Sequence, residues 1–200
     1  MPSISETNIQ SARNRQRIIQ SATKVFMADG YHASMDAIAA RAGVVKQTLY
    51  NHFACKNELF AEVVRNVTKK IVVTLDQHGD DLRATLFQFG MALREVALSP
   101  QGLALFRVLI AEAPRFPDLA KAIYAEGPQQ ASRQLARFIR RAMRAGQLRD
   151  DTPEFAAAIL IGMLLETERT RRLYGIPARG AAEDQVVAHI VDCFLRAFAP

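Results

Sequence analysis

The chain has 200 residues, half of them hydrophobic and 23% charged, a composition typical of globular proteins rather than of disordered or fibrous ones. Its two cysteines, Cys55 and Cys193, lie too far apart in the sequence to suggest a zinc site or a disulfide framework, so we expect a reducing compartment. The net charge of +6 is concentrated in residues 1–70, which hold ten basic and five acidic residues, and this local excess predicts contact with a polyanion.

The first twelve residues are polar and lack both the basic start and the apolar run of a secretory signal, so we expect a cytoplasmic protein. The first helix is predicted over 13–29. Its apolar residues Ile18, Ala22, Val25 and Phe26 recur at helical spacing, and Gly30 follows as a stop.

Two short helices come next. Ser34 offers an N-cap oxygen to the first of them, whose apolar face is formed by Ile38, Ala39 and Ala42 and which ends at Gly43. After a turn of two or three residues, the next helix carries Leu49 and Phe53 one turn apart, so that both can face its neighbour. We interpret residues 34–53 as a helix-turn-helix, in which the second helix enters the major groove of DNA.

The face of this recognition helix that points away from Leu49 carries hydrogen-bonding groups. With Leu49 as the inward reference, Val45 and Phe53 share its face, Gln47 and Asn51 lie opposite, and Lys46, Thr48 and Tyr50 lie on the flanks. Glutamine pairs with adenine, lysine with guanine, and threonine offers a hydroxyl together with a methyl group for thymine. Tyr50, His52 and Lys56 are instead suited to phosphates.

The rest of the chain is also predicted to be helical. A connecting helix is expected over about 57–77, and further helices over about 80–98, 101–113, 116–125, 128–146, 152–174 and 182–198, with proline or glycine between them. No run alternates polar and apolar residues as a β-strand would. We therefore predict an all-α fold with a helix-turn-helix DNA-binding domain over 1–56 and a helical ligand-binding and dimerisation domain over 78–200.

The last two predicted helices carry more apolar surface than packing on one side requires. Residues 155–165 are apolar around the whole helix, in a run well short of the ~20 residues of a membrane span. The last helix has a wide apolar stripe made of Val186, Val187, Ile190, Val191, Phe194, Leu195 and Phe198. We expect both helices to pack on two sides and to form, with a second copy, the four-helix bundle of a homodimer.

Catalytic patterns are missing from the sequence. There is no HExxH, GxSxG, P-loop or Gly-rich dinucleotide turn, and the four histidines are scattered. We therefore expect neither an enzyme nor a metal or cofactor site. The arginines that recur at helical spacing in 133–144 are interpreted as a solvated face, with binding of an anionic ligand or partner as the alternative.

The helix-turn-helix resembles the DNA-binding domain of the TetR family of bacterial repressors. The matching residues are Ile38 and Ala39, Ala42, Gly43 and Val44, Leu49 and Tyr50, His52 and Phe53, and Lys56. The resemblance implies base contacts from Lys46, Gln47 and Thr48 and phosphate contacts from Ser34, Tyr50, His52 and Lys56. Two features depart from the family pattern: Val45 stands where a serine usually caps the recognition helix, and the loop before Ile38 is one residue shorter.

Residues 99–151 resemble the regulatory domains of AcrR-type and AefR-type members of that family. The resemblance implies a cavity between helices that binds a small, hydrophobic effector. The residues that fit such a cavity are Phe87, Met91, Phe106, Leu109, Ile110, Phe116, Tyr124 and Phe138. For each of these residues, plain core packing is the alternative.

Together these features predict a ligand-responsive repressor that binds a palindromic DNA operator as a homodimer and is released by a small molecule. Two alternatives stay open: a transcriptional activator of the same fold, and a helical ligand-binding protein without a DNA function.

Overall fold

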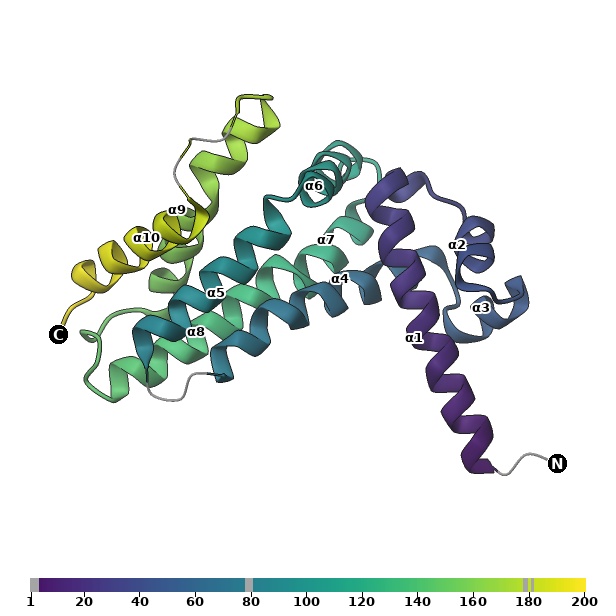
Figure 1. Cartoon of the computed structure of the whole chain (residues 1–200), viewed down its shortest axis with the longest axis horizontal. Helices are drawn as coiled ribbons and strands as arrows, with labels where there is room; N and C mark the ends of the chain where they lie inside the picture. Colours follow the sequence, from purple (N-terminus) through teal and green to yellow (C-terminus); the bar gives the residue numbers. More distant parts are fainter. Residues whose placement is uncertain (1–3, 78–80, 178–179, 181) are drawn as a thin grey trace. The chain divides into compact units, whose positions relative to one another are not determined.

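The computed structural model of the chain describes residues 4–77, 81–177, 180 and 182–200 (Figure 1). All regular structure in these ranges is helical, which confirms the predicted all-α class. The α-helices are α1 (Ile4–Asp29), α2 (Met35–Ala42), α3 (Lys46–His52), α4 (Lys56–Val72), α5 (Leu82–Ala97), α6 (Pro100–Glu112), α7 (Pro117–Glu126), α8 (Pro128–Arg144), α9 (Pro153–Leu173) and α10 (Glu183–Ala197). Short 3-10 turns occupy Gly30–His32 and Val73–Asp76. None of the described helices is both long enough and apolar enough to cross a membrane.

The helix boundaries after residue 81 agree with the predicted ones to within two residues. Residues 78–80, where the predicted second domain and its first helix begin, lie outside the described residues. The predicted start of the first helix near Arg13 is wrong, because α1 begins at Ile4. Residues 8–12 are exposed, so they form no buried face whose periodicity a sequence could reveal, and no glycine or proline interrupts the helix there.

The chain divides into two compact units. The first unit runs to Asn66 and also includes Ala104–Ile123, and the second unit consists of Val67–Leu103 and Tyr124–Pro200. This division differs from the boundaries predicted from sequence, because apolar residues of α7, among them Leu119 and Ile123, belong to the core of the first unit.

Each unit has its own hydrophobic core. In the first unit, Ile18 of α1, Ile38 of α2, Leu49 of α3 and Phe60 of α4 are fully buried together. In the second unit, the core is built from α5, α8, α9 and α10, with fully buried residues that include Phe89, Leu135, Leu160 and Val191. These residues recur at helical spacing in the sequence, so burial of one apolar face explains why each helix forms.

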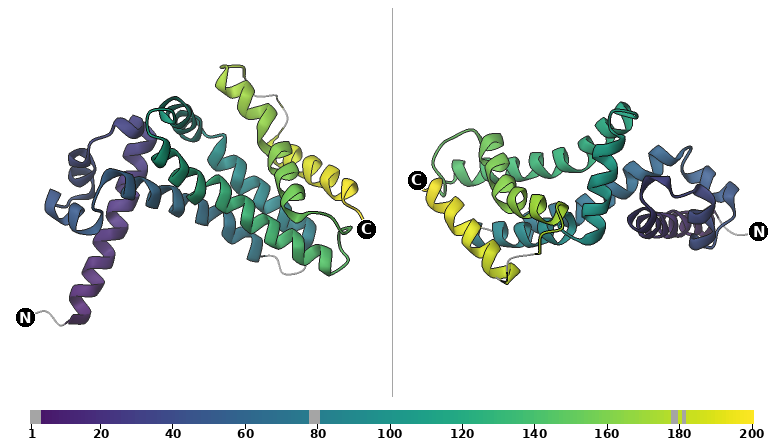
Figure 2. Two further views of the ribbon diagram at one scale, coloured as in Figure 1. Left: turned by 180° about the vertical axis from the view of Figure 1, so that it is seen from behind. Right: turned by 90° about the horizontal axis from the view of Figure 1, so that it is seen from above.

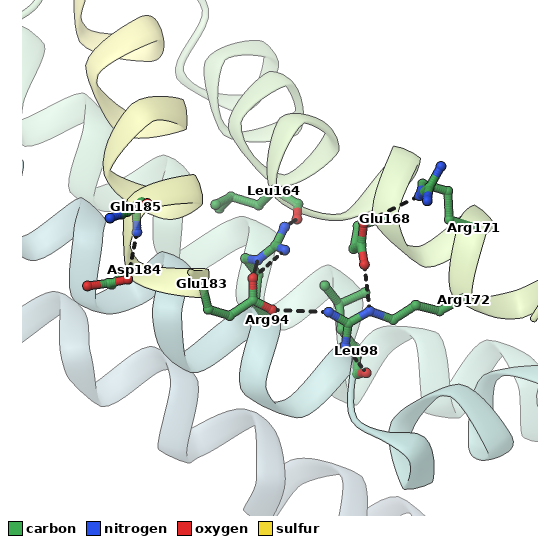
Figure 3. Close-up of polar contacts among 9 residues, drawn as sticks. All are labelled: Arg94, Leu98, Leu164, Glu168, Arg171, Arg172, Glu183, Asp184 and Gln185. Atoms are coloured by element: carbon green, nitrogen blue, oxygen red, sulfur yellow. Dashed lines mark hydrogen bonds and ion pairs between the residues drawn. The ribbon is translucent and has the colours of Figure 1, made fainter. Parts of the chain in front are cut away.

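A polar network crosses the second unit (Figure 3). Arg94 of α5 is only 4% exposed, and its guanidinium donates a hydrogen bond to the Leu164 carbonyl of α9. Nη2 and Nε of Arg94 also donate to Oε2 of Glu183, at 2.7 and 3.2 Å. Glu183 begins α10 and also accepts from Arg172 of α9 at 3.3 Å, while Arg172 donates to the Leu98 carbonyl at 2.9 Å. Because a buried guanidinium needs a carboxylate close by, the network fixes the start of α10 against α5 and α9.

Candidate nucleic-acid interface

The geometry of α2 follows from its two ends. Ser34 precedes the helix with extended backbone (φ −83°, ψ 150°), and its Oγ accepts a hydrogen bond from the Ala37 amide at 3.0 Å. Gly43 ends the helix with φ 63°, a left-handed conformation that favours glycine. The amides of Gly43 and Val44 donate to the carbonyls of Ala40 and Ala39 in the last turn of α2. This tight turn leads directly into α3 (Figure 1).

The inward face of α3 is only partly as predicted. Leu49 is fully buried and Phe53 is 1% exposed, so both contribute to the core of the first unit, as expected. The prediction that Val45 shares this face is wrong, because its side chain is 70% exposed. Val45 lies before the helix with extended backbone (φ −72°, ψ 151°), so the rotation of 100° per residue does not apply to it. The first turn of α3 also lacks a side-chain cap, in agreement with the departure noted in the sequence.

The opposite face of α3 presents polar side chains to solvent. Lys46, Gln47 and Asn51 are exposed, whereas Thr48 and His52 are half-buried. The Gln47 carboxamide donates to Oδ1 of Asn51 at 3.0 Å, one helical turn away. Tyr50 is exposed in spite of its large ring. The predicted base-reading residues therefore lie together on an accessible surface.

Lys46 has a partner that the sequence reasoning missed. Its Nζ lies 2.8 and 3.1 Å from the two carboxylate oxygens of Asp36, which sits in the first turn of α2. The hydrogen bond from Lys46 to Asp36, supported by the attraction of the opposite charges, raises the pKa of Lys46 above its usual value. The only signal in the sequence is an acidic residue at the start of one short helix and a basic residue at the start of the next. Both side chains are exposed, at 59% for Lys46 and 65% for Asp36, so solvent weakens the attraction between the two charges.

Lys56 is held by an aromatic ring. Its Nζ lies 4.4 Å from the centre of the Tyr31 ring, within the range of a cation–π interaction, and burial lowers the pKa of this lysine. The Tyr31 hydroxyl in turn donates a hydrogen bond to Oδ1 of Asn57. Lys56 is the first residue of α4, so Tyr31 offsets some of the unfavourable interaction between the ammonium group and the helix dipole.

All eight residues predicted to contact DNA lie in the first unit, between the cap of α2 and the first residue of α4. They are Ser34, Lys46, Gln47, Thr48, Tyr50, Asn51, His52 and Lys56. Among the described residues of this segment, Asp36 is the only acidic one, whereas Arg41, Lys46 and Lys56 are basic. The segment therefore combines exposed hydrogen-bonding groups with an excess of positive charge.

The residues predicted to bind an effector are not gathered in one unit. Phe87, Met91, Tyr124 and Phe138 belong to the second unit, and Phe106, Leu109, Ile110 and Phe116 to the first. Phe138 is buried in the core of the second unit, and Phe87 and Met91 pack against that core. Ile110, Phe116 and Tyr124 are exposed instead. An open hollow of about 520 Å³ in the second unit has a different lining, formed by Arg140, Met143, Arg144, Asp150, Asp151 and Pro153.

Comparisons with known proteins agree with this arrangement. Residues 18–63 match the family model for bacterial regulatory proteins of the tetR family, and residues 84–200 match the model for the AefR-like transcriptional repressor, C-terminal domain. A segment of 59 residues is 44% identical to the HTH-type transcriptional activator FasR of Mycolicibacterium smegmatis, and this match covers 29% of the chain and 27% of that relative.

Solved structures are similar over nearly the whole chain. A TetR-family transcriptional regulator from Mesorhizobium loti MAFF303099, described as putative, is 30% identical with a TM-score of 0.79, over 95% of this chain and 98% of that one. The flavonoid-responsive regulator FrrA is 29% identical with a TM-score of 0.70, over 94% and 98% of the two chains. The chain therefore belongs to the TetR family of DNA-binding transcriptional regulators, which are not enzymes, and combines the helix-turn-helix of that family with an AefR-like C-terminal domain.

Proposed function

We propose that the chain is a repressor that binds a pseudo-palindromic operator as a homodimer and leaves it when a small molecule binds. The observation that carries this proposal is the two-sided character of α3. Leu49 and Phe53 hold the helix in the core, while Lys46, Gln47 and Asn51 are exposed on the surface that would meet the major groove.

The proposed roles of the residues follow from their chemistry. Lys46, Gln47, Thr48 and Asn51 read base edges, because their amide, ammonium and hydroxyl groups match the pattern that bases present in the major groove. Ser34, Tyr50, His52 and Lys56 contact phosphates. The Ser34 oxygen accepts a bond from the Ala37 amide, and a hydroxyl that accepts one bond can donate another to a phosphate oxygen.

Dimerisation is proposed through α9 and α10, which lie against each other in both views of Figure 2. On α9, Phe155, Ile159 and Met163 recur at intervals of one turn, and all three are exposed, Phe155 by 54%. A Cβ added at Gly162 would meet nothing within 4 Å, so another helix can approach closely there. Because monomers rarely expose a contiguous apolar patch of this kind, we expect a second copy of the chain to pack against it.

The sign of regulation is proposed from the C-terminal domain. The match to an AefR-like repressor domain spans residues 84–200, whereas the match to the activator FasR covers 29% of the chain. Activation is the second candidate because of that relative. A reporter gene placed behind the operator decides between them: expression falls when a repressor is present and rises when an activator is present.

The effector is proposed to be a small hydrophobic molecule, and flavonoids are the first class to test because FrrA is named as flavonoid-responsive. If ligand binding releases the operator, operator DNA must weaken ligand binding by the same factor. Titration of the effector with and without operator measures both effects, and affinities without such coupling would contradict the release mechanism.

DNA binding itself is tested by selecting duplexes from a random pool with the full chain and measuring their affinity. Gln47→Ala should lose about 1–3 kcal/mol at a single base-pair position, whereas Lys56→Ala should weaken binding to all sequences alike. If the dimer contacts six to ten phosphates, affinity should fall by about 10³ to 10⁵ between 50 and 200 mM salt. An affinity that does not depend on salt would contradict the proposal.

The dimer is tested by sedimentation of the full chain at micromolar concentration. Met163→Lys places a charge in the exposed stripe of α9 and should shift the protein to monomer. Ile9→Lys is the matched control, because Ile9 is also a large exposed apolar residue but lies on α1. Dissociation by both variants or by neither would argue against this interface.

A further inference from the structure

The ion pair between Asp36 and Lys46 has an unusual place for a surface contact. Each side chain comes from the first turn of a helix, Asp36 from α2 and Lys46 from α3. The two are 65% and 59% exposed, and the ammonium lies 2.8 Å from the nearer carboxylate oxygen. An acceptor and a donor are therefore presented side by side at the start of the helix that would enter the major groove.

This pair matches the major-groove edge of one particular base pair. Guanine presents the acceptors O6 and N7, and the cytosine paired with it presents the N4 donor. O6 and N4 are joined by a Watson–Crick hydrogen bond, so they lie about 2.9 Å apart, a spacing close to that of the two side-chain groups. An ammonium that donates to O6 thus leaves the neighbouring carboxylate opposite N4.

Other base pairs fit the same pair of side chains less well. In the reversed pair, the ammonium would meet the cytosine donor and the carboxylate would meet the guanine acceptors. With thymine opposite Lys46, the O4 acceptor remains, but Asp36 would then face adenine, whose N7 acceptor stands beside the N6 donor. A carboxylate that accepts only is repelled by N7, so Asp36 disfavours each of these alternatives.

We propose that Asp36 and Lys46 together read one G·C base pair in each half-site, with Lys46 donating to guanine O6 and N7 and Asp36 accepting from cytosine N4. The proposal rests on the proposed DNA-binding role of α3 and adds Asp36 to it as a residue that determines specificity. Asp36 has a second effect. While it pairs with Lys46, its negative charge offsets the charge of the ammonium, so Lys46 attracts DNA phosphates less and affinity for unrelated DNA is reduced.

The test compares the full chain with Asp36→Ala by selection from a random duplex pool, followed by affinity measurements on single base-pair changes. Asp29→Ala is the matched control, because Asp29 is an exposed carboxylate at the end of α1 and lies outside α2 and α3. In the unaltered chain, changing the G·C pair to T·A keeps an acceptor for Lys46 but places adenine opposite Asp36, and it should lower affinity by about tenfold to a hundredfold. Asp36→Ala should reduce that difference to less than threefold while keeping the preferences at other positions.

Binding to unrelated duplexes provides the second readout. Asp36→Ala should bind them more tightly, with a salt dependence steeper by about two in the slope of log affinity against log salt for the dimer, since one lysine per subunit becomes available to phosphates. Unchanged base preferences in Asp36→Ala would overturn this inference alone. Failure of the unaltered chain to select any sequence would instead overturn the proposed function.

Discussion

The missing cap of α3 allows a substitution that should stabilise the protein. Val45 precedes α3 with φ −72° and ψ 151°, and Ser34 precedes α2 with nearly the same backbone angles, φ −83° and ψ 150°. Ser34 accepts a hydrogen bond from the third residue of its helix, Ala37. In Val45→Ser the new hydroxyl should therefore accept one from the third residue of α3, Thr48.

The size of the effect follows from the burial of Val45 and from known capping energies. A serine cap is worth about 0.5–2 kcal/mol, typically about 1, relative to alanine. The valine side chain is 70% exposed, so its removal sacrifices little buried area. We expect Val45→Ser to be about 1 kcal/mol more stable than Val45→Ala, which corresponds to a rise in Tm of about 2–4 °C for a chain of this length.

Urea unfolding followed by circular dichroism measures this difference. Ser34→Ala is the reciprocal control and should lose a similar free energy, because it removes the cap that α2 already has. The Thr48 amide already donates to the Val45 carbonyl at 2.9 Å. If that bond alone satisfies the first turn, Val45→Ser will be no more stable than Val45→Ala, and the reasoning from the Ser34 geometry is refuted.

Three further predictions concern other contacts. Glu183→Gln should cost about 2 kcal/mol because it leaves the buried Arg94 guanidinium without a carboxylate, whereas Arg94→Met should cost less than about 1 kcal/mol; urea unfolding measures both. Gly43→Ala should cost about 1–2 kcal/mol in the same assay, because φ at this position is 63°. Arg83 holds the pKa of Asp192 below its ordinary value of 3.8 through a hydrogen bond. The resulting stabilisation is present above that value and lost as pH falls through the lowered pKa, so Arg83→Met should be less stable than the unaltered chain at pH 6 but closer to it near pH 2.

Each of these predictions has an outcome that would contradict it. If Glu183→Gln and Arg94→Met lose the same free energy of unfolding, the network stabilises the protein through its hydrogen bonds and not through the pairing of a buried charge. An unchanged stability in Gly43→Ala would show that the turn adapts to a side chain. A gap between Arg83→Met and the unaltered chain that stays constant from pH 6 to pH 2 would show that the ion pair with Asp192 does not contribute.

The sequence alone was sufficient for the helices and for most of the recognition helix. Apolar residues at helical spacing identify the elements that bury one face, because such a face has to meet the core wherever the helix lies. Ile18, Leu49 and Phe53 are examples, and all three are buried as expected. The polar start of α1 has no buried face, so no periodicity could reveal it.

Other features were decided by tertiary structure because they depend on which side chains meet across elements. The helix-turn-helix places Asp36 beside Lys46, and the end of α1 with the following turn places Tyr31 under Lys56, although neither pair is close in sequence. The placement of α7 residues in the first unit likewise depends on the whole core rather than on any local pattern. Local periodicity thus determined which helices form and which faces they bury, whereas the partners of charged side chains, and with them the proposed specificity of α3, were determined only by how the helices pack.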